Sequence, residues 1–429
     1  MNTAGSPLPG TEPERAGRPL RVMISAGFSA GHALPALALA RALRERDHEV
    51  LLHLSERWRE PALELGSRFT PASDYVAFPG AAVNAGEPTV VDVARALAAV
   101  IRDFGADLVV GDLVAPATPL AAELAEVRGA TLIPTVYPVQ GPGHPPFPLG
   151  LLPPRTRLGA GAWRGLEPAT RPLRPAARWL RRVPGLLADA RTELGLVARP
   201  PGRAEITTYG PISDELAMVA TFPQLEYPRD WPPHVHVTGP MRFELPHPDV
   251  ELPAGDEPLV VVAVSTERDP AHELIGAALA ALAEEPVRVI ATTNRHDGGY
   301  SGRVPANARV VPWLSYSQVM PEAALVVSHG GHGTVARALE TGVPVLVCPP
   351  AGDMAENGAR VAWAGAGLML PGRLLSPRRL RLAVRRLLGE GRFAARAEAI
   401  ASWSRGNDGA ALGADLVEGL AGGRIVSGR

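Results

Sequence analysis

The sequence predicts an α/β protein with two doubly wound, Rossmann-like domains that face each other across a cleft. In both halves of the chain, apolar runs of strand length alternate with segments of helical periodicity, which is the pattern of parallel sheets covered by helices. A chain of 429 residues is also long for a single core. Between the halves, residues 238–257 carry Gly, Pro and charge without periodicity, as interdomain linkers do.

The first half opens as a strand–helix–strand unit. We expect a strand from Arg21, a loop of small residues, a helix that begins near Ala33 and a second strand from Glu49. Pro35 falls in the first helical turn, where its missing N–H is tolerated. A further strand ends at Asp112, and the apolar run after it has the composition of a strand buried on both faces.

Residues 137–202 are crowded with Pro, Gly and aromatic side chains, and we expect a long irregular segment of functional importance there. The arginines within residues 155–182 have few acidic residues near them in sequence. Two interpretations stay open: the arginines form a solvated helix face, or they form a lip over a cleft that attracts anions.

The second half repeats the alternation of strands and helices. Strands are expected within residues 259–266, 287–294, 307–313, 324–329 and 344–350, with helices within 271–285 and from 336. The predicted division is a disordered leader (1–18), an N-terminal domain (19–237), the linker (238–257), a C-terminal domain (258–405), and a C-terminal helix and tail that pack back on the N-terminal domain (406–429).

Composition excludes several classes of chemistry. The sequence contains no lysine, so all 43 basic residues are arginines. Schiff-base catalysis, a lysine-anchored pyridoxal cofactor and a P-loop with its lysine are therefore excluded. The net charge of −1 gives no overall attraction to nucleic acid.

Membrane and metal sites are also not expected. There is no uncharged apolar run of about 18 residues, and the leader lacks the apolar segment of a signal peptide, so we expect a cytoplasmic protein without a membrane span. Cys348 lies in an apolar strand and is expected to be a buried thiol. His234 and His236 share one strand face, but no third ligand with suitable spacing is nearby, so no metal site is expected.

The segment SHGGHGTVARALE places small and polar residues where a strand ends and a helix begins. Gly330, Gly331 and Gly333 remove side-chain bulk, so backbone amides at the positive end of the helix can approach an anion. His329 and Thr334 can each donate one hydrogen bond. The pattern predicts a diphosphate site that uses neither a metal nor a lysine.

His32 and Asp112 form a second candidate pair. His32 lies in the loop or first helical turn after the first strand, and Asp112 ends another strand of the same sheet, so the two can converge at the carboxyl edge. An imidazole with a pKa of about 6.5 can take a hydroxyl proton at neutral pH. A carboxylate on its other nitrogen fixes the tautomer.

Two segments resemble a known family. HGGHGTVARALETGVPVLVCPPAGDMAEN is similar to the donor signature of family 1 glycosyltransferases with the GT-B fold, and GHALPALALARAL is similar to their N-terminal helix. The linker segment VHVTGPM and the dipeptide PW before the donor motif match as well, so the resemblance covers about residues 20–413. It points to the bacterial branch that decorates antibiotics and other natural products.

The resemblance implies roles for individual residues. It implies that His32 is the general base, held by Asp112, and that Trp313 stacks on the nucleotide base. It places His329 at the β-phosphate and Gly333 with Thr334 at the α-phosphate. Three further positions match residues near the diphosphate or the donor sugar, namely Ser265, Thr266 and Asp353. The resemblance also makes residues 19–237 the acceptor-binding domain and residues 258–405 the donor-binding domain. A nucleotide-sugar is implied as co-substrate, linked to dTDP or UDP, with no cofactor.

Two positions depart from the family pattern. Arg337 stands where a glutamate often binds the ribose diol, and a guanidinium can only donate hydrogen bonds. Losing that acceptor is tolerable if the ribose lacks a 2′-hydroxyl, which favours a dTDP donor. Met354 stands where a glutamine commonly follows the aspartate, so the sugar pocket has one polar partner fewer. Together these positions favour a deoxysugar.

We therefore predict an inverting, metal-independent glycosyltransferase that acts on a hydroxyl of a bulky, apolar natural-product aglycone. Aromatic side chains expected to line the acceptor site are Tyr137, Phe147, Phe78 and Trp163. The alternatives are an N-acetylglucosaminyl transferase of the peptidoglycan type, a sugar-nucleotide epimerase, and a non-catalytic sugar-nucleotide-binding partner. The oligomeric state is left open, with a homodimer as one option.

Overall fold

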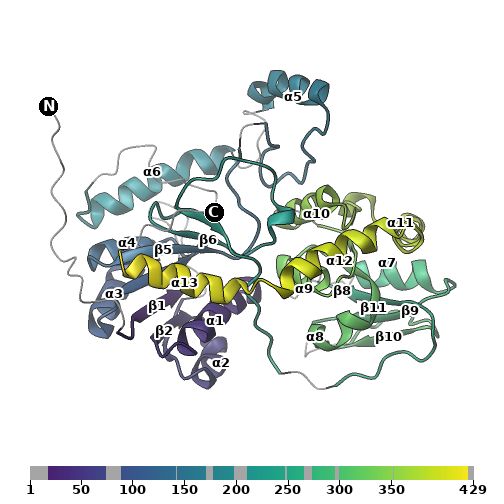
Figure 1. Ribbon diagram of the computed structural model, residues 1–429, viewed down its shortest axis with the longest axis horizontal. Coiled ribbons are helices and arrows are strands. Elements are labelled where there is room, and N and C mark those ends of the chain that lie inside the picture. Colours follow the sequence, from purple (N-terminus) through teal and green to yellow (C-terminus); the bar gives the residue numbers. More distant parts are fainter. Residues whose placement is uncertain are drawn as a thin grey trace.

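Two parallel sheets, each covered by helices, form the protein (Figure 1). The computed structural model describes residues 18–73, 88–141, 143–170, 177–197, 210–246, 249–264, 273–294, 299–350 and 352–423. Within these residues the first sheet has seven strands and the second has six, and every strand pairing is parallel. The predicted fold class is confirmed.

The N-terminal sheet has the strand order β3-β2-β1-β4-β5-β6-β7. Its strands are β1 (Arg21–Ser25), β2 (Glu49–Leu54), β3 (Arg68–Pro71), β4 (Leu108–Asp112), β5 (Arg128–Ile133), β6 (Ala217–Val219) and β7 (Val235–Val237). Its helices are α1 (Ala30–Arg44), α2 (Arg59–Glu64), α3 (Val90–Phe104), α4 (Ala117–Leu124), α5 (Arg157–Thr170) and α6 (Ala177–Glu193).

The C-terminal sheet has the order β10-β9-β8-β11-β12-β13. Its strands are β8 (Leu259–Ala263), β9 (Arg288–Thr292), β10 (Ala308–Val311), β11 (Ala323–Ser328), β12 (Val345–Val347) and β13 (Gly367–Met369). Its helices are α7 (Glu273–Leu282), α8 (Tyr316–Val319), α9 (His332–Glu340), α10 (Asp353–Ala364), α11 (Pro377–Gly389) and α12 (Arg392–Arg405). Short 3-10 turns occur at Glu56–Trp58, Pro223–Leu225, Met320–Glu322 and Gly372–Leu374.

The central strands are buried along their whole length because helices cover both faces of each sheet. All five residues of β4 and all five of β8 are buried. In parallel sheets of this kind, strand side chains contribute to the cores on both sides. Helix ends follow local chemistry: α3 starts at a capping box in which Thr89 accepts from the amide of Asp92 while the Asp92 carboxylate accepts from the amide of Thr89.

The segment predicted to be irregular contains helices α5 and α6, so that prediction was wrong over their length. Figure 1 shows α5 above the rest of the molecule and α6 along the N-terminal domain. In the second half of α6, Leu187 and Ala190 are buried against the core formed by α3 and α4. The many Pro and Gly residues concealed this helical spacing, and in α6 the packing of Leu187 and Ala190 overrides their weak helix propensity.

The chain crosses between the domains twice, and the two crossings touch. After α12 the chain returns to the N-terminal domain as α13 (Gly409–Ala421), which buries Ala414, Leu416 and Val417 in the same core as α1 (Figure 1). A side chain at Gly409 would begin 2.3 Å from the carbonyl oxygen of Gly239, at the start of the linker. Glycine is thus required at Gly409 for this close approach of two backbones.

We expect Gly409→Ala to destabilise the protein by about 1–3 kcal/mol, because backbone atoms cannot move aside as a flexible side chain would. Urea unfolding followed by circular dichroism measures the change. The matched control is Gly406→Ala, where the nearest atom to an added Cβ is 3.8 Å away. If the two variants are equally stable, the backbones at Gly239 and Gly409 can move apart at little cost.

Candidate active site

Three of the candidate residues, His32, Asp112 and His329, lie at the points where the strand order reverses in each sheet. In the N-terminal sheet the chain continues from β1 to β2 on one side and from β4 to β5 on the other. In the C-terminal sheet it continues from β8 to β9 on one side and from β11 to β12 on the other. Loops after such strands diverge and leave room for a ligand at the carboxyl edge. His32 and Asp112 belong to the first of these points and His329 to the second.

His32 and Asp112 are in contact. His32 is the third residue of α1, and its Nδ1 lies 2.9 Å and 3.0 Å from the two carboxylate oxygens of Asp112, the last residue of β4. The Asp112 side chain is 0% exposed, while that of His32 is 27% exposed. Asp112 also accepts a hydrogen bond of 2.8 Å from the amide of Val114. The carboxylate thus favours a proton on Nδ1 and leaves the lone pair on Nε2.

The loop between β1 and α1 is tight for a steric reason. A Cβ on Gly27 would lie 2.7 Å from Val114 and 3.5 Å from the Cβ of His32. Glycine therefore lets the loop approach the turn after β4 and bring the imidazole onto Asp112. Phe28 is held from the other side, since its carbonyl accepts hydrogen bonds from the side chains of Arg57 and Trp58.

The glycine-rich loop after β11 brings His329 to the start of α9. The Nδ1 of His329 lies 3.2 Å from the carbonyl oxygen of Ala263. A Cβ on Gly331, the N-cap residue of α9, would lie 2.4 Å from the Nε2 of His329. The ring nitrogen and the positive end of the helix therefore face the same volume, as an anion site needs.

The other glycines of this loop differ in what surrounds them. Gly330 has φ +97°, and a Cβ there would lie 2.8 Å from the backbone oxygen of Met354. Gly333 has no described atom within 4 Å of an added Cβ. Gly330 is thus required by the fold, whereas no described side chain crowds Gly333, so the described residues leave a ligand room to approach there.

Thr334 was predicted to contact the α-phosphate, and its hydroxyl is hydrogen-bonded to the hydroxyl of Tyr316. The amide of Asn294 also donates to Tyr316, over 3.4 Å. Burial raises the pKa of Tyr316, so the phenol stays protonated at neutral pH. Sequence reasoning missed Tyr316 and Asn294, because neither stands in the glycine-rich motif.

His332, the first residue of α9, bridges the two domains. Its Nε2 lies 3.2 Å from the carbonyl oxygen of Ala220, which follows β6. Burial lowers the pKa of His332, so the ring is neutral and the Nε2–H donates to Ala220.

The remaining residues that were expected to bind the donor are placed as follows. Trp313 is half-buried in the loop between β10 and α8, and Asp353 is the first residue of α10. Ser265 and Thr266 lie outside the residues that the structure describes, as does Phe78 on the acceptor side.

Tyr137, Phe147 and Trp163 are not brought together beside His32. Tyr137 is 1% exposed and packs against Trp231 with ring centroids 5.3 Å apart, so no face of its ring is open to an acceptor. Phe147 packs on the core of the C-terminal domain, and Trp163 is half-buried on α5. Aromatic residues in a Pro-rich segment look exposed in sequence, but here packing between elements covers them.

A cavity of about 600 Å³ lies beside Asp112 instead. Its walls come from α4, β5, α6 and residues 211–215, and much of the lining is apolar, including Leu120, Leu187 and Ile212. Leu187 could have been recognised from the spacing of α6, whereas the approach of α6 to α4 could not.

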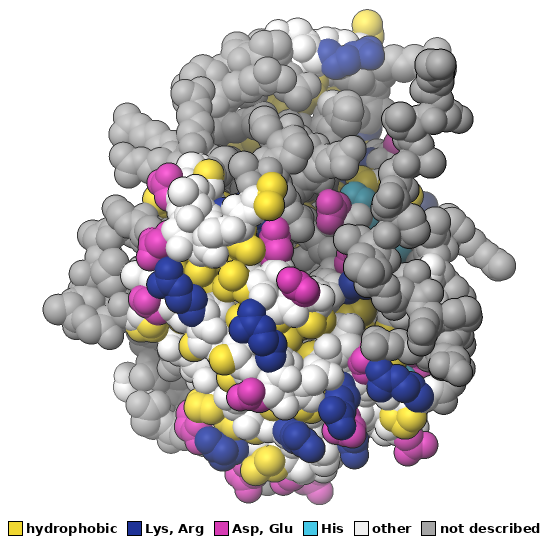
Figure 2. All heavy atoms as spheres, turned by 90° about the vertical axis from the view of Figure 1, so that its left-hand side faces the viewer, with side chains coloured by type: hydrophobic (Ala, Val, Ile, Leu, Met, Phe, Trp, Pro, Cys, Tyr) yellow, Lys and Arg dark blue, Asp and Glu magenta, His cyan; other side chains and the backbone are white. Residues whose placement is uncertain are grey.

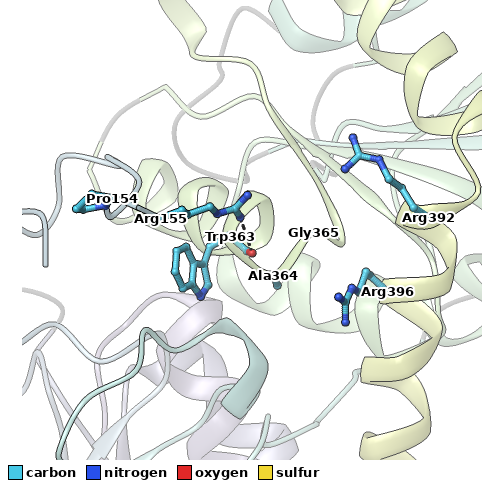
Figure 3. A pocket seen from close by; sticks show the side chains of 7 residues that line it. All are labelled: Pro154, Arg155, Trp363, Ala364, Gly365, Arg392 and Arg396. Atoms are coloured by element: carbon cyan, nitrogen blue, oxygen red, sulfur yellow. Dashed lines mark hydrogen bonds between the residues drawn. The ribbon is translucent and has the colours of Figure 1, made fainter. Parts of the chain in front are cut away.

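A second cavity, of about 560 Å³, is lined by three arginines and a tryptophan (Figure 3). Arg155 donates to the carbonyl oxygens of Ala362 and Trp363 at the end of α10, and its guanidinium lies 5.1 Å from the Trp363 ring centroid. Arg155 therefore caps a helix whose last carbonyls need donors. Neither of the two interpretations from the sequence included this role.

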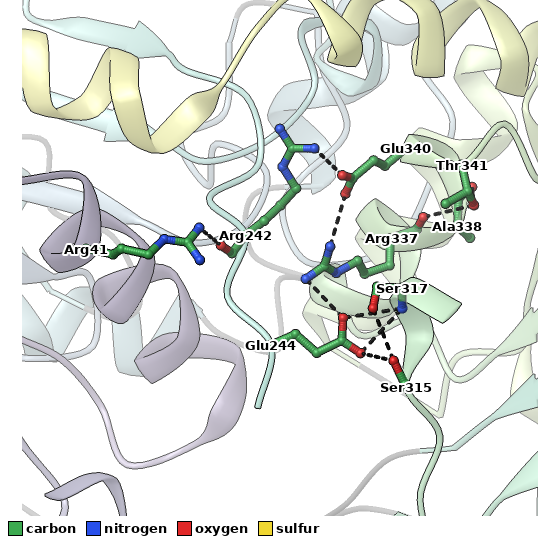
Figure 4. Close-up of polar contacts among 9 residues, drawn as sticks. All are labelled: Arg41, Arg242, Glu244, Ser315, Ser317, Arg337, Ala338, Glu340 and Thr341. Atoms are coloured by element: carbon green, nitrogen blue, oxygen red, sulfur yellow. Dashed lines mark hydrogen bonds and ion pairs between the residues drawn. The ribbon is translucent and has the colours of Figure 1, made fainter. Parts of the chain in front are cut away.

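Arg337 is bound by carboxylates from two elements (Figure 4). It lies 3.5 Å from Glu244 of the linker and 3.7 Å from Glu340 of α9. Glu244 also accepts from the hydroxyl of Ser315 and the amide of Ser317. The linker thus places a carboxylate beside the position where the family often has one, which the sequence did not reveal.

The described residues were also compared with the features of nucleic-acid, metal and membrane sites. On the face of the N-terminal domain seen in Figure 2, arginines are interspersed with acidic and apolar side chains. No group of three or more metal-ligating side chains occurs in the part of the chain that was searched. Among the described helices, none has the length and apolar character needed to cross a bilayer.

Comparison with known proteins identifies relatives of this architecture. Residues 276–406 match the family described as Erythromycin biosynthesis protein CIII-like, C-terminal domain. The chain is 31% identical to 4'-demethylrebeccamycin synthase of Lentzea aerocolonigenes, over 93% of this chain and 99% of that protein. It is 36% identical to O-mycaminosyltylonolide 6-deoxyallosyltransferase of Streptomyces fradiae, over 33% of this chain and 34% of that protein.

Solved structures show the same fold. The glycotransferase of kitacinnamycin superposes with a TM-score of 0.72 at 22% identity, over 94% of this chain and 99% of that one. The calicheamicin glycosyltransferase CalG4 gives a TM-score of 0.69 at 22% identity, with the same shares covered. The chain therefore belongs to the family of antibiotic glycosyltransferases, enzymes of the GT-B fold that transfer sugars to natural products.

Proposed function

We propose that the protein is an inverting glycosyltransferase in which His32 removes the proton of an acceptor hydroxyl. The observation that carries this proposal is the contact between Nδ1 of His32 and the buried carboxylate of Asp112. A carboxylate on one ring nitrogen makes the other a better base and stabilises the imidazolium that forms. No resident cofactor or metal enters this reaction, and we place it in the cytoplasm.

The chemistry is one displacement. As His32 takes the proton, the acceptor oxygen forms a bond to the anomeric carbon from the face opposite the leaving group. The bond from that carbon to the diphosphate breaks, and its electron pair leaves with the diphosphate. The charge that develops there is stabilised by His329 and the amides at the start of α9.

We infer a dTDP-linked deoxysugar as donor. Arg337 cannot accept from a ribose hydroxyl, and the nearby carboxylate of Glu244 already accepts from Ser315 and Ser317 and forms an ion pair with Arg337. Two structural neighbours carry this nucleotide: VinC was solved with dTDP and SsfS6 with thymidine diphosphate. The acceptor is a bulky, apolar aglycone, and the apolar lining of the cavity beside Asp112 suits such a molecule.

Gly333→Ala tests the diphosphate site. Because no described atom lies near the added methyl group, folding should be unaffected or favoured by up to about 1 kcal/mol. The methyl group would occupy the space from which the diphosphate approaches, and we expect dTDP affinity to fall about tenfold, equivalent to about 1.4 kcal/mol. Titration calorimetry gives the affinity and urea unfolding the stability.

Gly389→Ala is the matched control, since it also adds a methyl group with no described neighbour within 4 Å, at the end of α11. It should leave dTDP binding unchanged. If Gly333→Ala binds dTDP as tightly as this control, the diphosphate does not approach α9 at Gly333.

Mass spectrometry of transfer tests the overall reaction. A panel of dTDP- and UDP-sugars is incubated with polyketide-like aglycones, and we expect an aglycone mass gain of one deoxysugar residue from a dTDP donor. Conversion of the donor without an acceptor would indicate an epimerase instead. Nucleotide binding with neither donor hydrolysis nor transfer would indicate a non-catalytic binding partner.

A further inference from the structure

Helix α10 lies between the glycine-rich loop and the N-terminal domain. Its first turn packs against Gly330, where the backbone oxygen of Met354 leaves no room for a side chain. One turn further along, Asn357 and Arg360 are buried, although both are polar residues in an amphipathic helix. Buried polar groups of this kind need partners, and theirs come from both domains.

Asn357 connects the two domains through one amide group. Its Nδ2 donates to the carbonyl oxygen of Gly330 over 2.9 Å, and its Oδ1 accepts from the hydroxyl of Thr135 over 3.4 Å. Thr135 follows β5 in the N-terminal domain, and Asn357 is only 1% exposed. Gly330 has a positive φ, and the hydrogen bond from Asn357 to its carbonyl oxygen helps to hold this backbone conformation.

Other contacts fix α9 and α10 to the same domain. Arg360 bonds Glu226, which follows β6, over 2.7 Å. Glu356 accepts from the amide of Gly150 over 3.3 Å, and His332 of α9 donates to Ala220. Thr135 therefore faces a helix that is already anchored, so the position of its hydroxyl relative to the Gly330 loop is well defined.

We propose that Asn357 is a positioning residue that sets the diphosphate loop relative to the acceptor-binding domain. It acts through Gly330, whose carbonyl it holds, and Thr135 sets its orientation from the other domain. Nucleotide affinity thus depends on a hydroxyl of the domain that does not bind the nucleotide. This inference rests on the proposed function, since it takes the loop at Gly330 as the diphosphate site.

The test compares nucleotide affinity and stability in the same variants. Asn357→Asp keeps the shape but turns a carboxylate oxygen toward the Gly330 carbonyl, and we expect dTDP affinity to fall about tenfold or more. Thr135→Val removes only the hydroxyl and should weaken binding roughly threefold, while Thr135→Ser should restore it. In the variant that combines Asn357→Asp with Thr135→Val, the second change should cause no further loss of affinity, because both act through the contact of residue 357 with Gly330.

The control is Asn307→Ala, which removes amide bonds of 3.0 Å and 2.9 Å to Leu282 and Val287 within the C-terminal domain. It should lower the unfolding midpoint without changing dTDP affinity, measured at a temperature where circular dichroism shows all variants folded. If wild type binds dTDP and both Asn357→Asp and Thr135→Val bind it equally well, the inference is overturned while the proposed function stands. If wild type binds neither dTDP nor UDP, the proposed function fails and this inference with it.

Discussion

His32→Ala is expected to lower the turnover of sugar transfer by about 100- to 10,000-fold, the usual contribution of a general base. The imidazole belongs to the N-terminal domain, whereas the candidate diphosphate contacts lie in the C-terminal domain, so affinity for dTDP should stay nearly unchanged. Initial rates at saturating donor and acceptor, together with calorimetric titration of dTDP, measure the two effects separately. Retained binding with lost turnover assigns His32 to the chemical step.

Asp112→Asn refines this prediction. The amide has the shape of the carboxylate, but its NH₂ group can donate to Nδ1 of His32, which would move the ring proton to Nε2 and remove the base. We therefore expect a large loss of turnover with little change in stability or dTDP affinity. Full activity of His32→Ala would contradict the mechanism and would point to a nitrogen or carbon nucleophile that needs no base.

The sequence could predict this pair because the topology leaves little freedom. Strands buried on both faces appear as uninterrupted apolar runs, and parallel strands bring their carboxyl ends to one edge. His32 and Asp112 follow two such runs, which is why residues far apart in the chain could be paired before the structure was known. The same reasoning placed the loop at Gly330 at the start of a helix.

Contacts between elements could not be predicted, because periodicity describes only one element at a time. Glu226 and Arg360 have the charge of surface residues, and only the packing of α10 against the N-terminal domain buries them. Tyr137 was expected to line the acceptor site and is covered in the same way. Glu244 stands in a linker without any motif, yet it reaches Arg337 of α9.

Arg360→Met is expected to destabilise the protein by about 3–5 kcal/mol, the usual effect of removing one partner of a buried ion pair. The Arg360 guanidinium lies 2.7 Å from Glu226, 3.1 Å from Glu356 and 3.7 Å from the ring centroid of Tyr227, and the three charged side chains are at most 4% exposed. Methionine fills much of the volume but leaves two buried carboxylates without their cation. Urea unfolding at neutral pH measures the loss.

The pH dependence of this variant follows from the carboxylates. Burial already raises the pKa of Glu356 in the presence of Arg360, and without that cation its pKa must rise further. A group whose pKa is raised by folding favours the folded state at low pH and loses that contribution as pH rises through the folded pKa. The stability difference between Arg360→Met and wild type should therefore shrink on acidification, as Glu356 takes up a proton.

Arg386→Met is the matched control. Arg386 lies 2.8 Å from Glu390, a distance similar to those around Arg360, but both side chains of this pair are at least 40% exposed. Exposed pairs contribute about 0–1 kcal/mol, so this variant should change stability little at any pH. Arg360→Lys keeps the charge but loses the planar contact with Tyr227 and one of the two carboxylate bonds, so its stability should fall between those of wild type and Arg360→Met. If Arg360→Met unfolds like the surface control, water reaches the two carboxylates, and α10 is not held to the N-terminal domain by a buried charge.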